Sequence, residues 1–447
     1  MQQNADTIAA VATAPGRAGI GIIRASGPAV PAIIRGLIGR ELPPREAVLC
    51  NFRSAEGEAI DRGVALYFPA PRSYTGEDVL ELQGHGGPAV LQLLLRRCAE
   101  LGARAARPGE FTQRAFLNDK LDLAQAESVA DLIDASSELA ARGAMRSLSG
   151  EFSARILELN RGLIELRALV EATLDFPEED TNFLDKADAR GSLAKLRAEL
   201  NEVFTAARQG NILREGARVV LIGQPNVGKS SLMNRLAGDD VAIVTESPGT
   251  TRDPLKHLLI VEGVPLNVID TAGLRESHDE VEKLGIERTW REIATADVAL
   301  LIMEVGDGIT ESDQAILEKL PSGILKLFIF NKIDISGVRP GSSEMGGRTE
   351  IRLSAKTGEG LDLLRRALMV SIGWQPAGEV QFIARERHLQ ALQEAAAALD
   401  KAAGSGNAVE LFAEELRLAQ LALSRITGEF SADDLLGEIF SRFCIGK

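Results

Sequence analysis

Short apolar runs bounded by glycine and proline characterise the first part of the chain. They predict strands at residues 7–13, 20–24 and 78–83, and the last of these leads into a helix that ends near Leu101. Together these segments predict a mixed α+β domain over residues 1–118.

Helical spacing replaces this pattern from about residue 121 onward. Apolar positions recur every three or four residues in two long stripes, 148–170 and 193–207. Two further stripes, 389–399 and 416–426, follow much later in the chain. Because one apolar stripe cannot bury itself, these helices are expected to pack against one another.

Residues 216–375 separate the two groups of helices. Their apolar runs are short and continuous rather than alternating, which is typical of buried parallel strands. The simplest interpretation is a multidomain chain in which this α/β domain is inserted into one helical domain, made of residues 119–215 and 376–447. Insertion is well tolerated because the two ends of a domain usually lie close together. The alternative is two unconnected helical hairpins.

The inserted block opens with a phosphate-binding pattern. Residues 223–230 read Gly-Gln-Pro-Asn-Val-Gly-Lys-Ser, which matches G-x-x-x-x-G-K-[ST] between a predicted strand and a predicted helix. In such a loop backbone N–H groups surround a phosphate, Lys229 reaches the terminal phosphates, and the Ser230 hydroxyl binds Mg²⁺. An ordinary glycine-rich turn would not require that flanking strand and helix.

Three later strings indicate a guanine nucleotide. In Asp270-Thr271-Ala272-Gly273 the carboxylate can hold Mg²⁺ through water, and the glycine N–H can meet the γ-phosphate. In Asn331-Lys332-Ile333-Asp334 the last side chain can accept two hydrogen bonds from guanine, whereas adenine offers neither donor. Ser354-Ala355-Lys356 fits the loop that closes on the base from its other side. The order and spacing of these strings predict a P-loop GTPase domain.

One position departs from Ras-like enzymes, in which a glutamine after Asp-x-x-Gly orients the attacking water. Here Leu274 occupies that position and cannot form a hydrogen bond. Either hydrolysis is slow or another group supplies this role. Asn226 places a neutral oxygen beside the phosphates, where a monovalent cation could act in place of an arginine finger. Each feature alone could also be ordinary loop sequence.

Composition limits the compartment and the partners. The 447 residues are 45% hydrophobic and 26% charged, with no long apolar run, and Cys50, Cys98 and Cys444 form neither a disulfide framework nor a metal-binding spacing. We expect a cytoplasmic protein without membrane attachment. The net charge of −14 disfavours a broad nucleic-acid surface. One local basic run leaves RNA contact open: Arg96, Arg97, Arg104, Arg107 and Arg114.

The motifs together resemble those of the MnmE family of tRNA-modifying GTPases, and the resemblance covers the whole chain. Besides the GTPase strings it rests on the following stretches: Gly249-Thr250-Thr251-Arg252-Asp253, residues 75–87, 107–111 and 118–122, Leu435-Leu436-Gly437 and the final Phe443-Cys444-Ile445-Gly446-Lys447. It implies a homodimer that joins a flavin-dependent MnmG (GidA) type partner, which carries FAD, in a heterotetramer. That complex adds a carboxymethylaminomethyl or aminomethyl group at C5 of the wobble uridine, position 34, of certain tRNAs, bound largely through the partner.

The resemblance also implies a tetrahydrofolate derivative, 5-formyl or 5,10-methylene, as the one-carbon donor, held by an N-terminal domain that also dimerises. Its fold would be similar to that of folate-dependent aminomethyltransferases. Arg24, Glu81 and Lys120 would line the pocket, with Lys447 reaching it from the C-terminus. From the alternating pattern alone, Glu81 could equally belong to a solvated strand face. Cys444 is a candidate nucleophile, and the alternative is a thiol without chemical function.

For the GTPase domain the resemblance implies a K⁺ site at Asn226, Thr245, Ser247 and Thr250, with Ser230 and Thr251 on Mg²⁺. Glu282 would orient the attacking water through a second water. The implied GTP-binding residues are Asn226, Val227, Gly228, Lys229, Ser230, Ser231, Thr245, Glu246, Ser247, Pro248, Gly249, Thr250, Thr251, Asp270, Thr271, Ala272, Gly273, Asn331, Lys332, Asp334, Ser354, Ala355 and Lys356. The rival hypotheses are a ribosome-assembly GTPase without one-carbon chemistry and a scaffold whose GTP only sets assembly.

Overall fold

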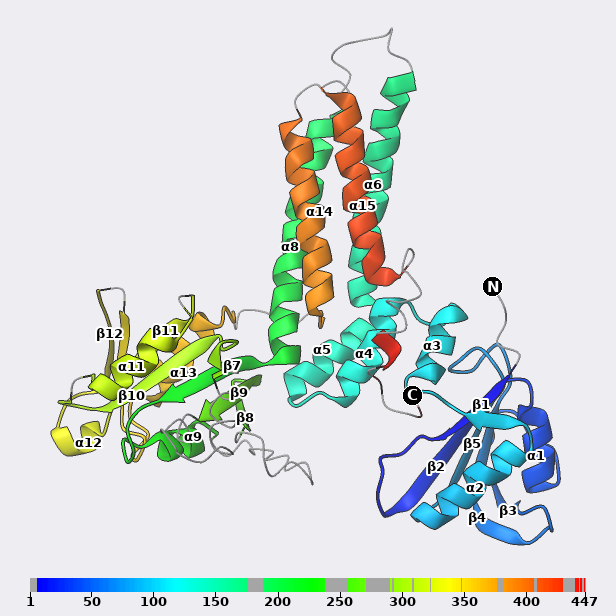
Figure 1. Cartoon of the computed structure of the whole chain (residues 1–447). Coiled ribbons are helices and arrows are strands. Elements are labelled where there is room, and N and C mark those ends of the chain that lie inside the picture. Colours follow the sequence, from blue (N-terminus) through cyan, green and yellow to red (C-terminus); the bar gives the residue numbers. More distant parts are fainter. Residues whose placement is uncertain are drawn as a thin grey trace. The chain divides into compact units, whose positions relative to one another are not determined.

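A computed structural model describes residues 6–175, 188–237, 256–270, 290–291, 293–307, 309–321, 323–346, 348–375, 382–405, 408–428, 439–441, 443 and 446. These residues form two compact units (Figure 1). The first unit draws on Met1–Ala130, Leu148–Ala187 and Lys401–Lys447, and the second on Asp131–Ser147 and Asp188–Asp400. No helix within the described ranges is both long and apolar enough to cross a membrane.

The first unit contains a six-stranded sheet of order β3-β4-β5-β2-β1-β6, in which only β1 and β6 pair in parallel. The strands are β1 Thr7–Val11, β2 Ala18–Ser26, β3 Val48–Arg53, β4 Ala59–Phe68, β5 Val79–Gly86 and β6 Ala103–Ala105. Helices α1 (Val30–Ile38) and α2 (Pro88–Glu100) pack on one face. Leu80 and Leu82 lie in that core, so Glu81 between them belongs to the opposite face. The predicted strands β1, β2 and β5 are confirmed.

Helices α3 (Glu110–Leu117) and α4 (Leu123–Ile133) follow this sheet in the chain. The described C-terminal residues return to the same unit, where Phe440 and Phe443 share an apolar cluster with Leu123. Further along, a Cβ added at Gly446 would lie 2.3 Å from the carbonyl oxygen of Val11 in β1. The end of the described chain is therefore in contact with its first strand.

Helices α6 (Glu151–Asp175) and α15 (Val409–Thr427) pack side by side in the first unit, although the GTPase strings lie between them in sequence (Figure 1). The amide of Asn160 donates to the Ser424 hydroxyl across this contact. The prediction that helices before and after the inserted block pack together is confirmed. The predicted first stripe is wrong at its start, because Leu148 ends a separate helix and Gly150, at a φ of 91°, breaks the chain before α6.

The second unit is built on a seven-stranded sheet of order β12-β13-β11-β10-β7-β9-β8 with antiparallel strands at both edges. Its elements are β7 Ala217–Ile222, α9 Lys229–Ala237, β8 Lys256–Val261, β9 Val264–Asp270, β10 Val298–Glu304, α11 Glu311–Lys319, β11 Leu325–Asn331, α12 Ile333–Ser336, β12 Gly341–Met345, β13 Arg348–Arg352 and α13 Leu361–Ser371. Val219 and Leu221 of β7 join one core, whereas Val220 and Ile222 join another. Burial on both faces explains the continuous apolar run of this strand.

Among the described residues, the second unit also contains α5 (Glu138–Leu148), α8 (Ala189–Glu215) and the part of α14 (Glu386–Gly404) up to Asp400. Small side chains of α5, Ala140 and Ala144, are buried in the same core as Val219 of the central strand. Residues 131–147 thus pack with the seven-stranded sheet, although their sequence lies among the helices that precede it.

Asp131 forms ion pairs with two arginines, one where the chain enters the seven-stranded sheet and one where it leaves it. Asp131, nearly buried, accepts hydrogen bonds from Arg214 Nε at 2.7 Å and from Arg385 Nη2 at 2.8 Å. Arg214 lies in the last turn of α8 and Arg385 directly before α14. The same two segments also approach closely at Gly210 of α8, where an added Cβ would lie 2.2 Å from the carbonyl oxygen of Phe382.

Candidate functional site

The loop between β7 and α9 has a backbone shape that requires its two terminal glycines. Gly223 has a φ of 153° and Gly228 a φ of 99°. A Cβ at Gly223 would lie 2.3 Å from the Ile302 carbonyl oxygen, and one at Gly228 would lie 2.3 Å from Asn331 Nδ2. No side chain fits at either position, so the loop keeps the open shape that lets backbone amides surround a phosphate.

Lys229 begins α9 and bends back over this loop. Its Nζ donates to the carbonyl of Gly223 at 2.7 Å and to that of Gln224 at 3.1 Å. These contacts hold an ammonium group above the loop, in the position that neutralises bound phosphates. Ser230 is the next residue on the helix and is exposed.

Asn331 at the end of β11 joins the phosphate loop to the Ser354–Ala355 segment. Its side chain is 2% exposed. Nδ2 donates to the Val227 carbonyl at 2.7 Å, and Oδ1 accepts from the Ala355 amide at 2.8 Å. Both hydrogen bonds are buried, so this side chain fixes the spacing of the two loops.

The Asp334 carboxylate is exposed and held in one orientation. The hydroxyl of Ser354 donates to its Oδ1 at 2.7 Å and accepts from the Thr357 amide at 3.1 Å. Among the described residues no hydrogen bond engages Asp334 Oδ2. The neighbouring Lys332 pairs with Glu304 at the end of β10. This arrangement presents a carboxylate to a base with adjacent N–H donors.

The structure brings these predicted residues together at the carboxyl ends of parallel strands, where ligands bind in open α/β sheets. Asp270 is the last residue of β9, and only its backbone is described. Ser231 and Lys356 are described and exposed. The remaining predicted residues of this site lie outside the described ranges: Thr245, Glu246, Ser247, Pro248, Gly249, Thr250, Thr251, Thr271, Ala272, Gly273 and Glu282. Asn226 is therefore the one described member of the predicted K⁺ set, and it is exposed with a φ of 65°.

A second group of predicted residues meets on the first unit's sheet. Arg24 of β2 is the cross-strand neighbour of Glu81 of β5, and its Nε and Nη2 both donate to Glu81 Oε1, at 2.9 and 2.7 Å. No described residue donates to Oε2, which leaves one carboxylate oxygen for a ligand. Tyr74 and Phe111 place their ring centroids 5.7 and 5.9 Å from the Arg24 guanidinium carbon.

Lys120 is exposed. A Cβ at Gly76 would be 3.1 Å from its Cε, so the lysine stem passes over that glycine. Cys444 and Lys447 lie outside the described residues. Sequence reasoning missed Tyr74, whose only signal is its place next to the Thr75-Gly76-Glu77 string.

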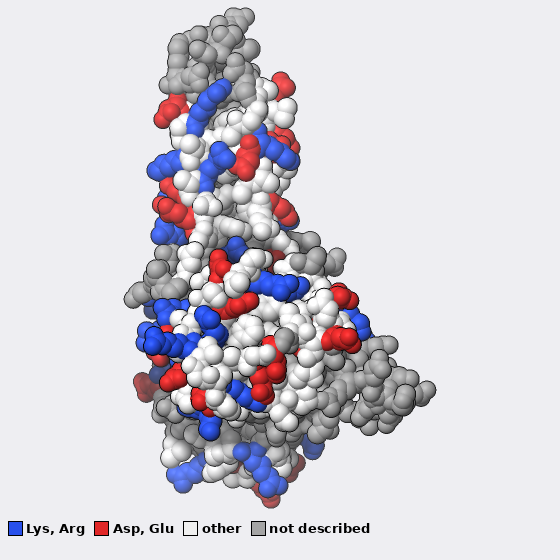
Figure 2. Space-filling view, turned by 90° about the vertical axis from the view of Figure 1, so that its left-hand side faces the viewer, with Lys and Arg blue, Asp and Glu red and all other residues white. Residues whose placement is uncertain are grey.

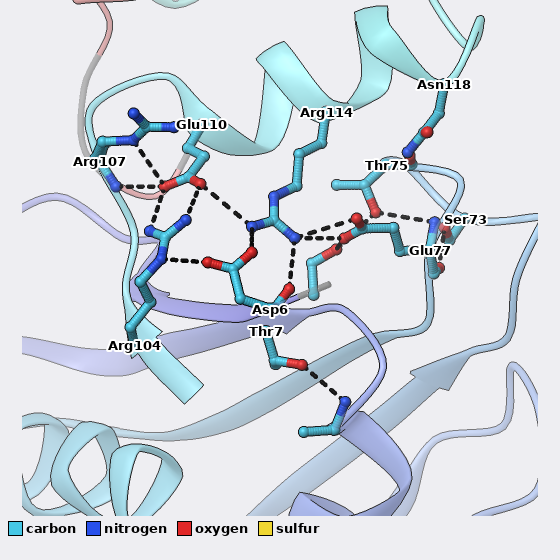
Figure 3. A network of polar contacts seen from close by, with 12 residues as sticks. Asp6, Thr7, Ser73, Thr75, Glu77, Arg104, Arg107, Glu110, Arg114 and Asn118 are labelled. Carbon is cyan, nitrogen blue, oxygen red and sulfur yellow. Dashed lines mark hydrogen bonds and ion pairs between the residues drawn. The ribbon is translucent and has the colours of Figure 1, made fainter. Parts of the chain in front are cut away.

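The basic run is largely neutralised within the protein rather than free for RNA. Arg114 is buried and binds Glu77, Asp6 and Glu110, and Arg104 binds Asp6 and Glu110 (Figure 3). Arg97 pairs with Glu100. On the face shown in Figure 2, basic and acidic side chains are interspersed and form no single basic area.

Two carboxylates of this network, Glu110 and Asp6, are stabilised in their charged form. Burial opposes ionisation of Glu110, but hydrogen bonds from Arg104, the Arg107 amide and Arg114 lower its pKa to about 2. Burial likewise opposes ionisation of Asp6, and the same two arginine side chains hold its pKa below the ordinary value. The Asp6 and Glu110 carboxylates are therefore charged near neutral pH.

Two family models match this chain. Residues 7–120 match one described as the GTP-binding protein TrmE N-terminus, and residues 123–444 match one described as the MnmE helical domain. A protein of Laribacter hongkongensis named tRNA modification GTPase MnmE is 60% identical over 100% of both chains. Proteins of the same name from Chromobacterium violaceum and Neisseria meningitidis are 59% and 58% identical; the first match covers 99% of this chain and 98% of that protein, the second 100% of each.

Proposed function

This chain belongs to the MnmE family, and because its full-length relatives are named tRNA modification GTPases, we propose that it hydrolyses GTP as part of a tRNA-modifying complex. The observation that carries the GTP assignment is Asn331, which joins the phosphate-binding loop to the segment that orients Asp334. The test is a nucleotide titration. Preference for GTP over ATP is expected, and a preference for ATP would remove the proposal.

We further propose that hydrolysis depends on K⁺. Leu274 cannot orient water, and the exposed Asn226 offers an amide oxygen beside the phosphate loop. Thr245, Ser247 and Thr250 would complete the K⁺ site, Ser230 and Thr251 would hold Mg²⁺, and Glu282 would act on the water. When bound, the two cations would stabilise the negative charge of the phosphate oxygens. GTP hydrolysis is expected to be faster in KCl than in NaCl at equal ionic strength, and equal rates would contradict the K⁺ site.

The N-terminal domain is proposed to bind a tetrahydrofolate, 5-formyl or 5,10-methylene, which supplies a one-carbon unit. The fit rests on the free Glu81 oxygen beside Arg24, because a pterin presents adjacent N–H donors to a carboxylate. Gly446 contacts Val11, whose β2 neighbour Ile23 adjoins Arg24, and this supports a role for Lys447 in the same pocket. Calorimetry should detect 5-formyltetrahydrofolate binding that Arg24→Ala abolishes.

The proposed product is a carboxymethylaminomethyl or aminomethyl group at C5 of the wobble uridine. It would be formed by a homodimer of this chain with a flavin-dependent partner that also binds most of the tRNA. Mass spectrometry of tRNA from cells that lack this protein tests the assignment. Unmodified wobble uridine is expected, and unchanged modification would favour a ribosome-assembly role instead.

A further inference from the structure

The loop of residues 73–77 adjoins the candidate folate-binding side chains from two directions. Tyr74 faces the Arg24 guanidinium, and Gly76 lies under the stem of Lys120. Gly76 has a φ of 79°, and a Cβ there would also lie 3.1 Å from Asn118 Cβ. The shape of this loop therefore determines where two side chains of the pocket can point.

Polar contacts fix the loop at both ends (Figure 3). Both carboxylate oxygens of Glu77 accept from Arg114 Nη1 at 3.1 Å, and Oε2 also accepts from the Ser26 hydroxyl at 2.7 Å. Ser73 donates to the Glu77 carbonyl, and the Asn118 amide donates to the Thr75 carbonyl at 2.7 Å. Ser26 and Arg24 lie two residues apart on β2, so they share one face of the sheet.

The charges of this network balance one another. Arg104, Arg107 and Arg114 face Asp6, Glu77 and Glu110, which gives three positive and three negative groups. Arg114 and Glu110 are each 1% exposed, so neither can reach a ligand. These two buried side chains can therefore act on a ligand only through the loop.

We propose that Glu77 and Arg114 are positioning residues for the folate site, and that they act by holding the 73–77 loop so that Gly76 directs Lys120 toward the carboxylates of the ligand's tail. This inference depends on the proposed folate function. It assigns a role in binding to an ion pair whose arginine is 1% exposed and whose carboxylate is 17% exposed.

A double-mutant cycle with calorimetry of 5-formyltetrahydrofolate tests the link between Gly76 and Lys120. Lys120→Ala should weaken binding about 10- to 100-fold, the range for a lost charge-assisted hydrogen bond. Gly76→Ala should weaken it to a similar extent, and the double variant should bind within about twofold of Lys120→Ala alone. Additive losses would overturn the proposal, because Gly76 would then act independently of Lys120.

Glu77→Gln tests the ion pair in the full chain. Folate binding should weaken about 10- to 100-fold, as is typical when a supporting residue behind a binding group is lost, while GTP hydrolysis stays unchanged. Should this variant fail to fold, Ser26→Ala removes the hydrogen bonds of Ser26 to Glu77 and to Thr75 of the loop without leaving a buried charge, and about fivefold weaker binding is expected. Arg107→Ala is the control, because Arg107 is 68% exposed and reaches Glu110 but not the loop.

The outcomes separate the inference from the function on which it depends. Wild-type protein that binds no 5-formyltetrahydrofolate would remove both. Wild-type binding that is unchanged in folded Glu77→Gln and Ser26→Ala proteins would remove the inference and leave the function. Loss of affinity in Arg107→Ala equal to that in Glu77→Gln would also overturn it, since a general loss of stability would then explain both.

Discussion

Asn331 donates to Val227 and accepts from Ala355, so one buried side chain holds together the candidate phosphate-binding loop and the Ser354–Ala355 segment. Gly228 makes this contact possible, because any side chain there would meet Asn331 Nδ2. At the scale of the residue, close contacts of this kind fix the geometry of the site. The sequence motifs identify the residues of the site, and the distances between atoms show which residues hold the others in place.

Asn331→Ala should weaken GDP binding about 10- to 100-fold. The change leaves a buried carbonyl and a buried amide without their partner, and each costs about 1–3 kcal/mol. Titration of a fluorescent GDP analogue measures the effect. The exposed Glu359→Ala serves as the control and should stay within about twofold of the wild type. An Asn331→Ala protein with wild-type affinity would show that the bridge is not needed.

Glu110 predicts a pH dependence of stability. Its pKa in the folded protein, about 2, lies below its ordinary value of 4.5. The unfolded chain therefore binds the proton more readily, so the stabilisation is complete above about pH 4.5 and is lost as the pH falls toward 2. Thermal unfolding followed by circular dichroism should show this decline. The Glu110→Gln protein should be less stable at neutral pH, and its stability should change less with pH between 4.5 and 2. The same dependence of stability on pH as in the wild type would contradict the prediction.

At the scale of the element, α8 shows how a glycine can be favourable inside a helix. Gly210 is a poor helix former, yet it allows the chain at Phe382 and Ile383 to pass against the helix. The nearby Asn211 donates to the Ala384 carbonyl, and Gln209 donates to that of Gly373. Three successive residues of α8 therefore bind the returning chain.

Gly210→Ala tests whether the close contact between Gly210 and the backbone of Phe382 outweighs the low helix propensity of glycine. Propensity alone predicts a gain of about 1 kcal/mol, whereas the contact at 2.2 Å with a backbone oxygen predicts a loss of about 1–3 kcal/mol. We expect the loss, measured by chemical denaturation. Asn201→Ala on an exposed face of α8 is the matched control and should be slightly stabilising.

Elements with strong apolar periods were predictable, and those with weak ones were not. The stripes at α8, α14 and α15 and the continuous run of β7 all appear where the sequence predicts them. By contrast, α5 buries alanine, glycine and serine, which allow close packing but give little apolar signal. The Arg24–Glu81 contact depends on the register of β2 against β5, which local sequence does not specify.

At the scale of the whole molecule, each compact unit is made of stretches that are separate in sequence. Residues 131–147 belong with the seven-stranded sheet, although the helices that precede and follow them in sequence belong to the first unit. Asp131 stands at this boundary and binds Arg214 and Arg385, where the chain enters and leaves that sheet. The domain limits at residues 118, 215 and 375 remain a proposal based on sequence.

Asp131→Ala should destabilise the second unit by about 2–4 kcal/mol, because removing one partner leaves two guanidinium groups without their shared carboxylate. This expected loss lies toward the lower end of the range for broken buried ion pairs, because both arginines keep some contact with solvent. Differential scanning calorimetry of the full chain measures the shift. Glu138→Ala, in an exposed pair with Arg142, should change stability by less than about 0.5 kcal/mol.

Helix α8 is continuous over its 27 residues and joins β7 through Gly216, whose amide still bonds to Ile212. A helix of that length extends about 40 Å, so a tilt of about 5° at its lower end displaces the opposite end by about 3.5 Å. A tilt of α8 relative to β7, the strand that precedes the phosphate loop, would therefore be amplified along the helix. Angular changes too small to disturb the packing beside β7 become displacements as large as the width of an atom at its far tip.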